Sequence, residues 1–327
     1  MTDLHEAGEW GAIARLAAQL GPAPAGEIGL GDDAAAGRIA PGCLALTTVD
    51  LLVEGVHFRT HTTPPEALGH KALAVSLSDI AAMGGKARWA VVGLALPPTT
   101  TLAWVEALYA GMAALAHAHG VTIAGGDTVR AAGGIVLSMT VVGEAATPLL
   151  RSDARPGDVV FMTGPAGLAA AGLWCLEHGQ HDEAAIAAHR RPQPQLAAGQ
   201  GLAALNTRIA LIDNSDGLGR SAQALAEASG VDLVLWPEAF PCETATTRVA
   251  ALAGIAAERW VLGGGEDYGL VGCVSVAGWP GVVAALSSAG APATRVGEVR
   301  PGTGRAWVRG SDGALDAPAD AGFGHFG

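Results

Sequence analysis

The sequence predicts an α/β (α+β) protein of two domains. Its 327 residues are enough for about two domains of ordinary size, and half of them are apolar, so each domain can bury a core. Apolar segments rich in β-branched residues alternate with segments of helical periodicity, which is typical of mixed folds. A polar segment with prolines and arginines, residues 147–158, separates a first domain at 1–147 from a second at 148–327.

The first half contains the signals for three helices and four strands. Residues 9–20 have the spacing of a short amphipathic helix, and the glycine-rich residues 29–37 predict a loop. A longer helix begins at the paired prolines and ends at the paired glycines of 64–85, and a third helix is expected at 101–119. Strands are predicted at 43–53, 87–96, 121–124 and 135–143.

The second half continues the alternation. Strands are predicted at 158–163, 208–213, 231–236, 259–262 and 268–276. Helices are predicted at 166–179, 193–205, 217–229 and 280–289. The segment after Pro301 is rich in glycine, alanine, aspartate and proline, so most of it is expected to be loop.

Composition excludes several classes of function. The formal net charge of −12 repels phosphate backbones and anionic lipids, so neither nucleic acid nor a membrane is an expected partner. No apolar run approaches the ~20 residues of a membrane span, and the polar, acidic first residues lack the features of a signal peptide. A cytoplasmic protein is therefore expected. Lys86 does not belong to a Walker A loop, and the four separated cysteines form no zinc or disulfide pattern.

Carboxylates are the informative residues in a chain of which only 15% is charged. Asp50 lies within a predicted apolar strand and Asp79 within an apolar predicted helix, where an ionised carboxylate is unfavourable unless a cation pairs with it. Lysine is nearly absent, and oxygen ligands without histidine or cysteine favour Mg²⁺. Any single aspartate can instead cap a helix or shape a turn, but such roles do not account for these two. Further carboxylates follow strands or lie in glycine-rich loops: Asp32, Asp33, Asp127, Asp213, Asp216, Glu266 and Asp267.

Glycine-rich loops beside these carboxylates indicate a phosphate ligand. The segment GLGDDA at 29–34 fits a dinucleotide fingerprint weakly, because no strand precedes it and two aspartates would face the pyrophosphate. With Mg²⁺ between them, the same loop suits a metal–phosphate site. His57 is a lone histidine, and the other histidines, among them His189, are predicted on solvated faces. Since no motif offers a covalent nucleophile, the residues favour direct phosphoryl transfer from ATP.

Nine motifs then occur in a fixed order along nearly the whole chain. They are GLGDDAA (29–35), TTVDLLVEGVHF (47–58), KALAVSLSDIAAMGG (71–85), GGDT (125–128), RSDARPGD (151–158), RPQPQ (191–195), IDNSDGL (212–218), LGGGEDY (262–268) and GFGHF (322–326). This pattern resembles the thiamine-monophosphate kinase family, in the superfamily of aminoimidazole ribonucleotide synthetase and selenophosphate synthetase.

The resemblance implies a synthetase-like two-domain fold. The N-terminal sheet domain would bind ATP and Mg²⁺ and pair with a second copy in a homodimer, and the C-terminal α/β domain would complete the nucleotide and substrate site. The implied reaction transfers the γ-phosphoryl group of ATP to thiamine monophosphate, which gives thiamine diphosphate.

The resemblance also implies three groups of site residues. The ligands of several Mg²⁺ ions would be Asp33, Thr48, Val49, Asp50, Asp79, Asp127, Asp213 and Asp216. ATP would contact Tyr109, Gly126, Asp127, Arg151 and Ser215, and Arg151 would offer a guanidinium fork to a phosphate. Thiamine monophosphate would contact His57, Glu266 and Phe323, because a carboxylate and an aromatic ring suit its cationic thiazolium and flat pyrimidine. Asp32 would act from behind the metal ligands.

Three positions depart from the family pattern. Asn214 replaces an apolar residue, and Gly269 and Gly324 replace acidic ones. Two alternatives remain open: another member of the superfamily with a different acceptor, or a catalytically silent nucleotide- or metal-binding scaffold. Selenophosphate synthetase is disfavoured because the N-terminal glycine-rich segment lacks Cys and Lys, and aminoimidazole ribonucleotide synthetase because LGGGEDY and GFGHF fit the kinase.

Overall fold

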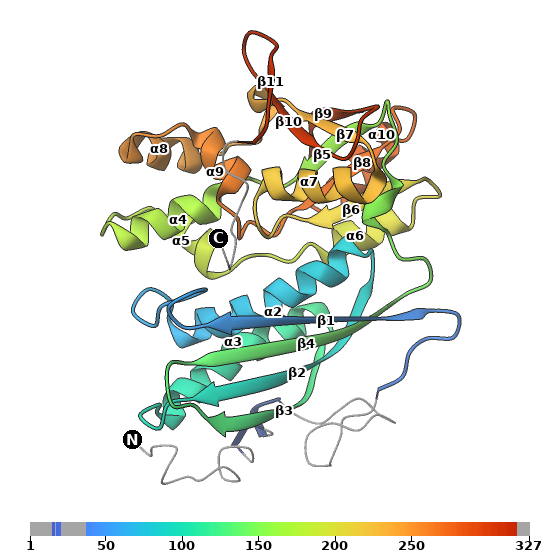
Figure 1. Cartoon of the computed structure of the whole chain (residues 1–327). Helices are drawn as coiled ribbons and strands as arrows, with labels where there is room; N and C mark the ends of the chain where they lie inside the picture. The colour runs from blue at the N-terminus through green and yellow to red at the C-terminus, as the bar shows by residue number, and fades with distance from the viewer. Residues whose placement is uncertain (1–14, 17, 21–36, 319–327) are drawn as a thin grey trace. The chain divides into compact units, whose positions relative to one another are not determined.

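The computed structural model describes residues 15–16, 18–20 and 37–318, and the chain divides into two compact units (Figure 1). Unit 1 comprises residues 1–80 and 86–146, and unit 2 comprises residues 81–85 and 147–327. Each unit combines a sheet with helices, which confirms the predicted α/β (α+β) class. The helical residues 15–16 and 18–20 agree with the predicted helix at 9–20.

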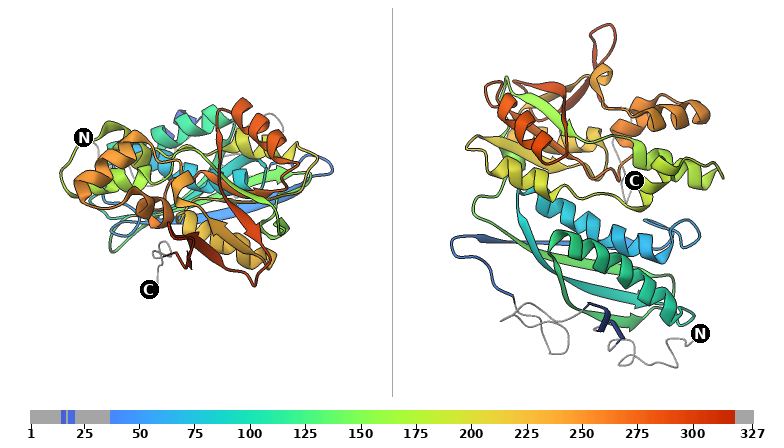
Figure 2. Two further views of the ribbon diagram at one scale, coloured as in Figure 1. Left: turned by 90° about the horizontal axis from the view of Figure 1, so that it is seen from above. Right: turned by 180° about the vertical axis from the view of Figure 1, so that it is seen from behind.

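Unit 1 is a four-stranded sheet with two helices on one face. Its described elements are β1 (Leu44–Val53), α2 (Pro65–Ala82), β2 (Lys86–Leu96), α3 (Leu102–His119), β3 (Thr122–Arg130) and β4 (Val136–Ala145). The strand order is β1-β4-β2-β3, in which β2 and β3 run parallel and the other neighbours antiparallel. The edges of the sheet are therefore β1 and β3. Helices α2 and α3 lie side by side over one face (Figure 2, right).

Glycines allow these two helices to pack closely. A Cβ atom at Gly69 of α2 would lie 1.8 Å from the carbonyl oxygen of Leu108, and one at Gly111 of α3 would lie 1.9 Å from that of Glu66. The helix backbones thus touch at two points where a larger residue has no room. This contact fixes α2 against α3, and α2 carries Asp79, one of the predicted carboxylates.

Strand β3 corrects the prediction of a short strand at 121–124. The strand does not end at the paired glycines but continues to Arg130, which pairs with Leu96 of β2. A Cβ atom at Gly126 would lie 2.1 Å from the carbonyl oxygen of Val92. These glycines mark a close approach of two strands, which sequence reasoning took for the end of one.

Unit 2 is built on a seven-stranded sheet in the order β11-β10-β7-β9-β5-β8-β6, in which β7 and β10 run parallel and the other neighbours antiparallel. Its described strands are β5 (Val159–Thr163), β6 (Ile209–Asp213), β7 (Asp232–Leu235), β8 (Leu270–Val274), β9 (Ala293–Arg300), β10 (Ala306–Arg309) and β11 (Leu315–Asp316). Its described helices are η1 (Arg151–Asp153), α4 (Leu168–Glu177), α5 (Glu183–Arg190), α6 (Leu196–Ala203), α7 (Leu218–Ser229), η2 (Pro237–Ala239), α8 (Thr244–Ala253), α9 (Ala257–Gly263) and α10 (Trp279–Ser288).

Two apolar clusters hold unit 2 together. The larger one packs α7 against the sheet and contains Leu218 and Leu225 of α7 together with Val160 of β5 and Ile212 of the edge strand β6. The smaller one joins α4, α5 and α8, and Trp260 of α9 packs against it. These four helices form a separate layer beside the sheet (Figure 1).

Several predicted elements of unit 2 were wrong. Residues 259–262 form part of helix α9, because Val261 packs in the larger cluster and Trp260 against the smaller one, which a strand in the sheet would not permit. The alanine-rich helices α5 and α8 were missed, as was strand β9. The described segment after Pro301 is mostly loop, as expected, with the two short strands β10 and β11 in it. None of the helices in the described part of the chain is long and apolar enough to cross a membrane.

Candidate active site

The first group of predicted site residues lies between β1 and α2 in unit 1. Side chains alternate along β1, so that Thr48 and Asp50 share the face on which Leu46 and Leu52 are buried. The Thr48 hydroxyl donates a hydrogen bond to Asp79 Oδ2, and the Ser76 hydroxyl donates one of 2.6 Å to Asp50 Oδ2. The cluster therefore consists of Thr48 and Asp50 on β1 and of Ser76 and Asp79, one turn apart on α2.

Electrostatics make this cluster a candidate for cation binding. The pKa of Asp50 is raised to about 6, mainly by burial; the Ser76 hydrogen bond acts in the opposite direction, and the nearby Asp79 carboxylate adds to the rise. A divalent cation would remove both the desolvation penalty and the repulsion. Carboxylate and hydroxyl oxygens are the donors that Mg²⁺ prefers, so the residues present fit that ion.

Two more predicted residues lie on or after β1. Val49 points away from the face that carries Thr48 and Asp50 and is exposed. His57 follows the strand, and its Nδ1 accepts a hydrogen bond of 3.0 Å from the Val53 amide. This bond fixes the orientation of the imidazole ring relative to the end of β1.

The predicted ATP ligands of unit 1 lie on other elements. Tyr109 is buried on α3, and burial raises the pKa of its hydroxyl to about 12. Gly126 and Asp127 lie exposed on the edge strand β3. Since β4 and β2 separate β3 from β1, Asp127 and Asp50 occupy opposite edges of the sheet.

The second group lies in unit 2, where two loops are joined backbone to backbone. Asp213 ends β6, and Ser215 and Asp216 lie in the turn before α7. The Asn214 amide donates to the Gly269 carbonyl (2.7 Å), the Tyr268 amide to the Asn214 carbonyl (3.0 Å), and the Glu266 amide to the Ser215 carbonyl (2.6 Å). These hydrogen bonds bring the predicted metal and ATP ligands of IDNSDGL beside the predicted substrate ligand of LGGGEDY.

The LGGGEDY loop adopts an unusual backbone. Glu266 and Tyr268 have positive φ angles of 60° and 51°, which side chains other than glycine rarely adopt. Between them, Asp267 accepts hydrogen bonds from the amides of Gly167 (2.7 Å) and Ala169 (3.2 Å) at the start of α4. Burial raises the pKa of Asp267 to about 7. Asp267 anchors the loop.

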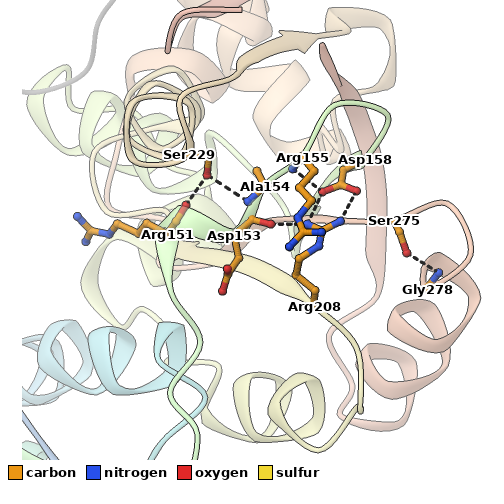
Figure 3. A network of polar contacts seen from close by, with 9 residues as sticks. All are labelled: Arg151, Asp153, Ala154, Arg155, Asp158, Arg208, Ser229, Ser275 and Gly278. Carbon is orange, nitrogen blue, oxygen red and sulfur yellow. Dashed lines mark hydrogen bonds and ion pairs between the residues drawn. The ribbon is translucent and has the colours of Figure 1, made fainter. Parts of the chain in front are cut away.

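Arg151 belongs to a third motif of unit 2, RSDARPGD. Its carbonyl accepts a hydrogen bond from the Ser229 hydroxyl (2.9 Å), while its guanidinium points away from the polar network around it (Figure 3). In that network Arg208 binds both oxygens of Asp158, at 2.7 and 2.8 Å. The ion pair fixes the motif to the start of β6 and leaves the exposed Arg151 side chain available to a ligand.

One departure from the family pattern has a structural explanation. A Cβ atom at Gly269 would lie 2.6 Å from the carbonyl oxygen of Thr163, so the close approach of the chain requires glycine here. Asn214 is fully buried; its side-chain oxygen accepts a hydrogen bond of 3.3 Å from Ser221 of α7, but its Nδ2 has no partner among the described residues, so nothing in the structure explains this departure. Asp32, Asp33, Phe323 and Gly324 lie outside the described residues.

Sequence reasoning missed three residues that support the site. The only signal for Ser76 in the sequence is its place one turn before Asp79 on the same helix face. The only signal for Asp267 is its place next to Glu266. His189, predicted on a solvated face, is instead buried, and its Nδ1 lies 3.0 Å from Glu266 Oε2. Among the described residues, no three His, Cys, Asp or Glu side chains gather in a group of metal-binding size.

Comparison with known proteins identifies the family. Residues 31–145 match the AIR synthase related protein, N-terminal domain, and residues 155–308 match the C-terminal domain. The thiamine-monophosphate kinase of Bacillus subtilis (strain 168) is 36% identical over 309 residues, which cover 92% of this chain and 94% of that protein.

Solved structures agree. The thiamine-monophosphate kinase from Stenotrophomonas maltophilia K279a has a TM-score of 0.81 at 30% identity and covers 93% of this chain and 95% of that one. A structure described as AaThiL complexed with AMPPCP and TMP has a TM-score of 0.78 at 30% identity, over 100% of this chain and 99% of that one. The chain therefore belongs to the AIR synthase related protein family and, within it, to the thiamine-monophosphate kinases.

Proposed function

We propose that this protein phosphorylates thiamine monophosphate with ATP, which yields thiamine diphosphate and ADP in thiamine diphosphate biosynthesis. The observation that carries the proposal is the identity of 36% with a thiamine-monophosphate kinase over nearly the full length of both chains. A relative described as complexed with AMPPCP and TMP supports ATP as the co-substrate. The need for ATP supports a cytoplasmic location.

The proposal assigns the site residues to three tasks. Asp33, Thr48, Val49, Asp50, Asp79, Asp127, Asp213 and Asp216 hold Mg²⁺ ions. Tyr109, Gly126, Asp127, Arg151 and Ser215 bind ATP. His57, Glu266 and Phe323 bind thiamine monophosphate. The hydroxyl–carboxylate cluster on β1 and α2 and the joined loops of unit 2 support these assignments.

The proposed mechanism is direct in-line transfer. Bound Mg²⁺ would supply positive charge to the donor and acceptor phosphates, which otherwise repel each other. Thr48 and Ser76 orient the carboxylates of Asp79 and Asp50 by hydrogen bonds, so these side chains need little rearrangement when they bind the ion. Arg151 extends an exposed guanidinium toward a phosphate, and Glu266 presents a carboxylate to the cationic thiazolium ring.

The two halves of the chain have different roles in this proposal. Residues 1–147 bind ATP and Mg²⁺ and form the dimer, and residues 148–327 complete the nucleotide and substrate site. Exposed apolar residues on the edge strands of unit 1, Val49 and Leu51 on β1 and Val129 on β3, support burial against a second copy.

The strand order gives a second argument for a homodimer. Asp50 and Asp127 lie on opposite edges of a four-stranded sheet, three strand spacings or about 14 Å apart. Two oxygens bound to one Mg²⁺ lie only about 4 Å apart or less. One copy therefore does not bring both carboxylates to one ion, whereas Asp127 from a partner's edge strand can complete the cluster around Asp50.

Subunit complementation tests this arrangement. The variants D50N and D127N are each expected to be inactive. When the two are mixed, dissociated and reassociated, about half of the dimers should be heterodimers. Each heterodimer has one site with both aspartates and one site with neither. Activity should therefore return to about one quarter of the wild-type value. Mixtures that stay inactive, although mixed dimers are present by mass spectrometry, would contradict the shared site.

Steady-state kinetics test the function itself. ADP release from ATP and Mg²⁺ should depend on thiamine monophosphate and should not increase with free thiamine, because only the monophosphate offers phosphate oxygens to the metal. An equal rate with thiamine, or release that no thiamine compound stimulates, would favour another acceptor within the superfamily.

A further inference from the structure

One buried histidine lies beside the proposed substrate residue. His189, on the last turn of α5, has a side chain that is 3% exposed, and its Nδ1 lies 3.0 Å from Oε2 of Glu266. The Glu266 side chain is 27% exposed, so it can reach a ligand while it contacts the imidazole. No motif of the nine contains His189; it stands just before RPQPQ.

The position of His189 depends on close packing between α4 and α5. A Cβ atom at Gly172 of α4 would lie 2.0 Å from the carbonyl oxygen of Ala185 and 3.0 Å from the Cβ of His189. Helix α5 therefore rests directly on the backbone of α4, and any larger residue at 172 would push the histidine away from Glu266.

The other end of α5 is fixed as well. Asp182 caps the helix by accepting a hydrogen bond of 3.1 Å from the Ala185 amide. The same carboxylate binds the guanidinium of Arg248 on α8, with a distance of 3.1 Å from Nε to Oδ2. Helix α5 is thus held at its first turn by α8 and along its length by α4, so the imidazole is a rigid support.

Glu266 is fixed from its backbone in a complementary way. Its φ angle is 60° and that of Tyr268 is 51°; Asp267 between them bonds to the start of α4, while the Glu266 carboxylate lies beside His189 of α5. The Glu266 amide donates to the Ser215 carbonyl (2.6 Å). The backbone thus determines where the side chain starts, but its carboxylate can still rotate unless another group holds it.

We infer that His189 is a positioning residue for the substrate: its imidazole holds one oxygen of the Glu266 carboxylate, so that the other oxygen faces the cationic ring of thiamine monophosphate. The inference rests on the proposed function. It predicts an effect on the affinity for thiamine monophosphate and not on the affinity for ATP, because the contact involves Glu266 alone among the proposed ligands.

Three variants test it. H189L keeps an apolar side chain in the buried site but removes the ring nitrogen, and it should raise KM for thiamine monophosphate about tenfold, with KM for ATP and kcat within about twofold. H189N places an amide nitrogen where Nδ1 lies, and it should restore most of the affinity. The matched control is H181L, at an exposed histidine outside the site, which should behave as the wild type.

A double-mutant cycle separates positioning from general support. In an E266Q background, H189L should add less than a twofold change, because the carboxylate that the histidine holds is gone. An unchanged KM in H189L would overturn the inference, and so would equal losses for ATP and thiamine monophosphate, a failure of H189N to rescue, or a full additional effect in E266Q. Absence of any activity with thiamine monophosphate in the wild type would instead overturn the proposed function, and this inference with it.

Discussion

The two units present their carboxylates in different ways. In unit 1, Asp50 and Asp79 lie on a regular strand and a regular helix, and the hydroxyls of Ser76 and Thr48 hold them. In unit 2, Asp213 ends a strand, while Ser215, Asp216 and Glu266 lie in loops that backbone hydrogen bonds join. Side chains therefore determine the first arrangement and main-chain geometry the second.

This difference predicts how each region responds to substitution. A side chain in the unit 1 cluster can be replaced while the strand and the helix persist. A substitution there should therefore lower the catalytic rate without lowering the stability of the fold. In unit 2, the positive φ angles of Glu266 and Tyr268 and the hydrogen bonds of Asp267 link the loop conformation to the fold. Substitutions that strain this backbone or remove these hydrogen bonds should alter stability as well as chemistry.

The largest expected effect is the loss of turnover in D50N. Asparagine has nearly the same size but no charge to hold Mg²⁺, so kcat should fall at least about a hundredfold, or about 3 kcal/mol. In EDTA at pH 8 the variant should melt no lower than the wild type, because burial and repulsion from Asp79 destabilise the ionised Asp50. A clear drop in melting temperature with near-normal kcat would mean that Asp50 is structural.

Backbone packing in unit 1 should matter where two strands approach each other. G126A would bring a methyl group within 2.1 Å of the Val92 carbonyl oxygen, and it should destabilise the protein by about 2–3 kcal/mol. Thermal unfolding of G126A is compared with that of G133A, where a Cβ atom meets nothing within 4 Å. Equal melting temperatures for G126A and G133A would contradict the close packing of β3 on β2.

Asp267 should make the stability of unit 2 depend on pH. Its pKa is about 7 in the fold and near 3.8 in the unfolded chain, so between about pH 4 and 7 the folded chain keeps a proton that the unfolded chain has lost. This group's contribution to stability therefore decreases as pH rises through that range. D267N has no carboxyl group here to titrate. The difference in free energy of unfolding between D267N and the wild type should therefore shift in favour of D267N by on the order of 2 kcal/mol from pH 5 to pH 8. Unfolding in EDTA at both pH values measures it, and a constant difference would contradict the assigned burial.

The smallest expected effect concerns the strained backbone of the loop. Glycine adopts positive φ without strain, so E266G should be as stable as the wild type or up to about 1 kcal/mol more stable, although it loses the substrate carboxylate. G265A is the control variant for which the opposite effect is expected, because the φ angle at this residue is 68° and the added Cβ would lie 2.8 Å from the Ser215 carbonyl oxygen. It should be destabilised. Equal stability of E266G and G265A would contradict a role of main-chain geometry in shaping this loop.

Residues whose role depends on local surroundings could be predicted from the sequence. Asp50 and Asp79 were found because a carboxylate within an apolar element needs a partner. The mixed fold and most elements of unit 1 followed from periodicity and from proline and glycine boundaries. The resemblance then supplied the roles of residues such as Arg151, which no local rule identifies.

Features that depend on distant contacts could not be predicted. His189 looks like any exposed histidine on a helix, because its contact with Glu266 lies far along the chain. Gly125 and Gly126 look like the end of a strand, because the close approach to β2 is visible only in the sheet. The apolar run in α9 suits a strand as well as a helix until its packing between two clusters is known.

The fate of the γ-phosphoryl group tests direct transfer to thiamine monophosphate. ATP labelled at that position is incubated with the protein and Mg²⁺, together with thiamine monophosphate, with thiamine or with neither, and the products are separated by chromatography. We expect label in thiamine diphosphate in the first sample, no labelled thiamine compound in the others, and no label on the denatured protein. Label in thiamine monophosphate formed from thiamine, or label bound to the protein with ATP alone, would contradict direct transfer between metal-bound phosphates.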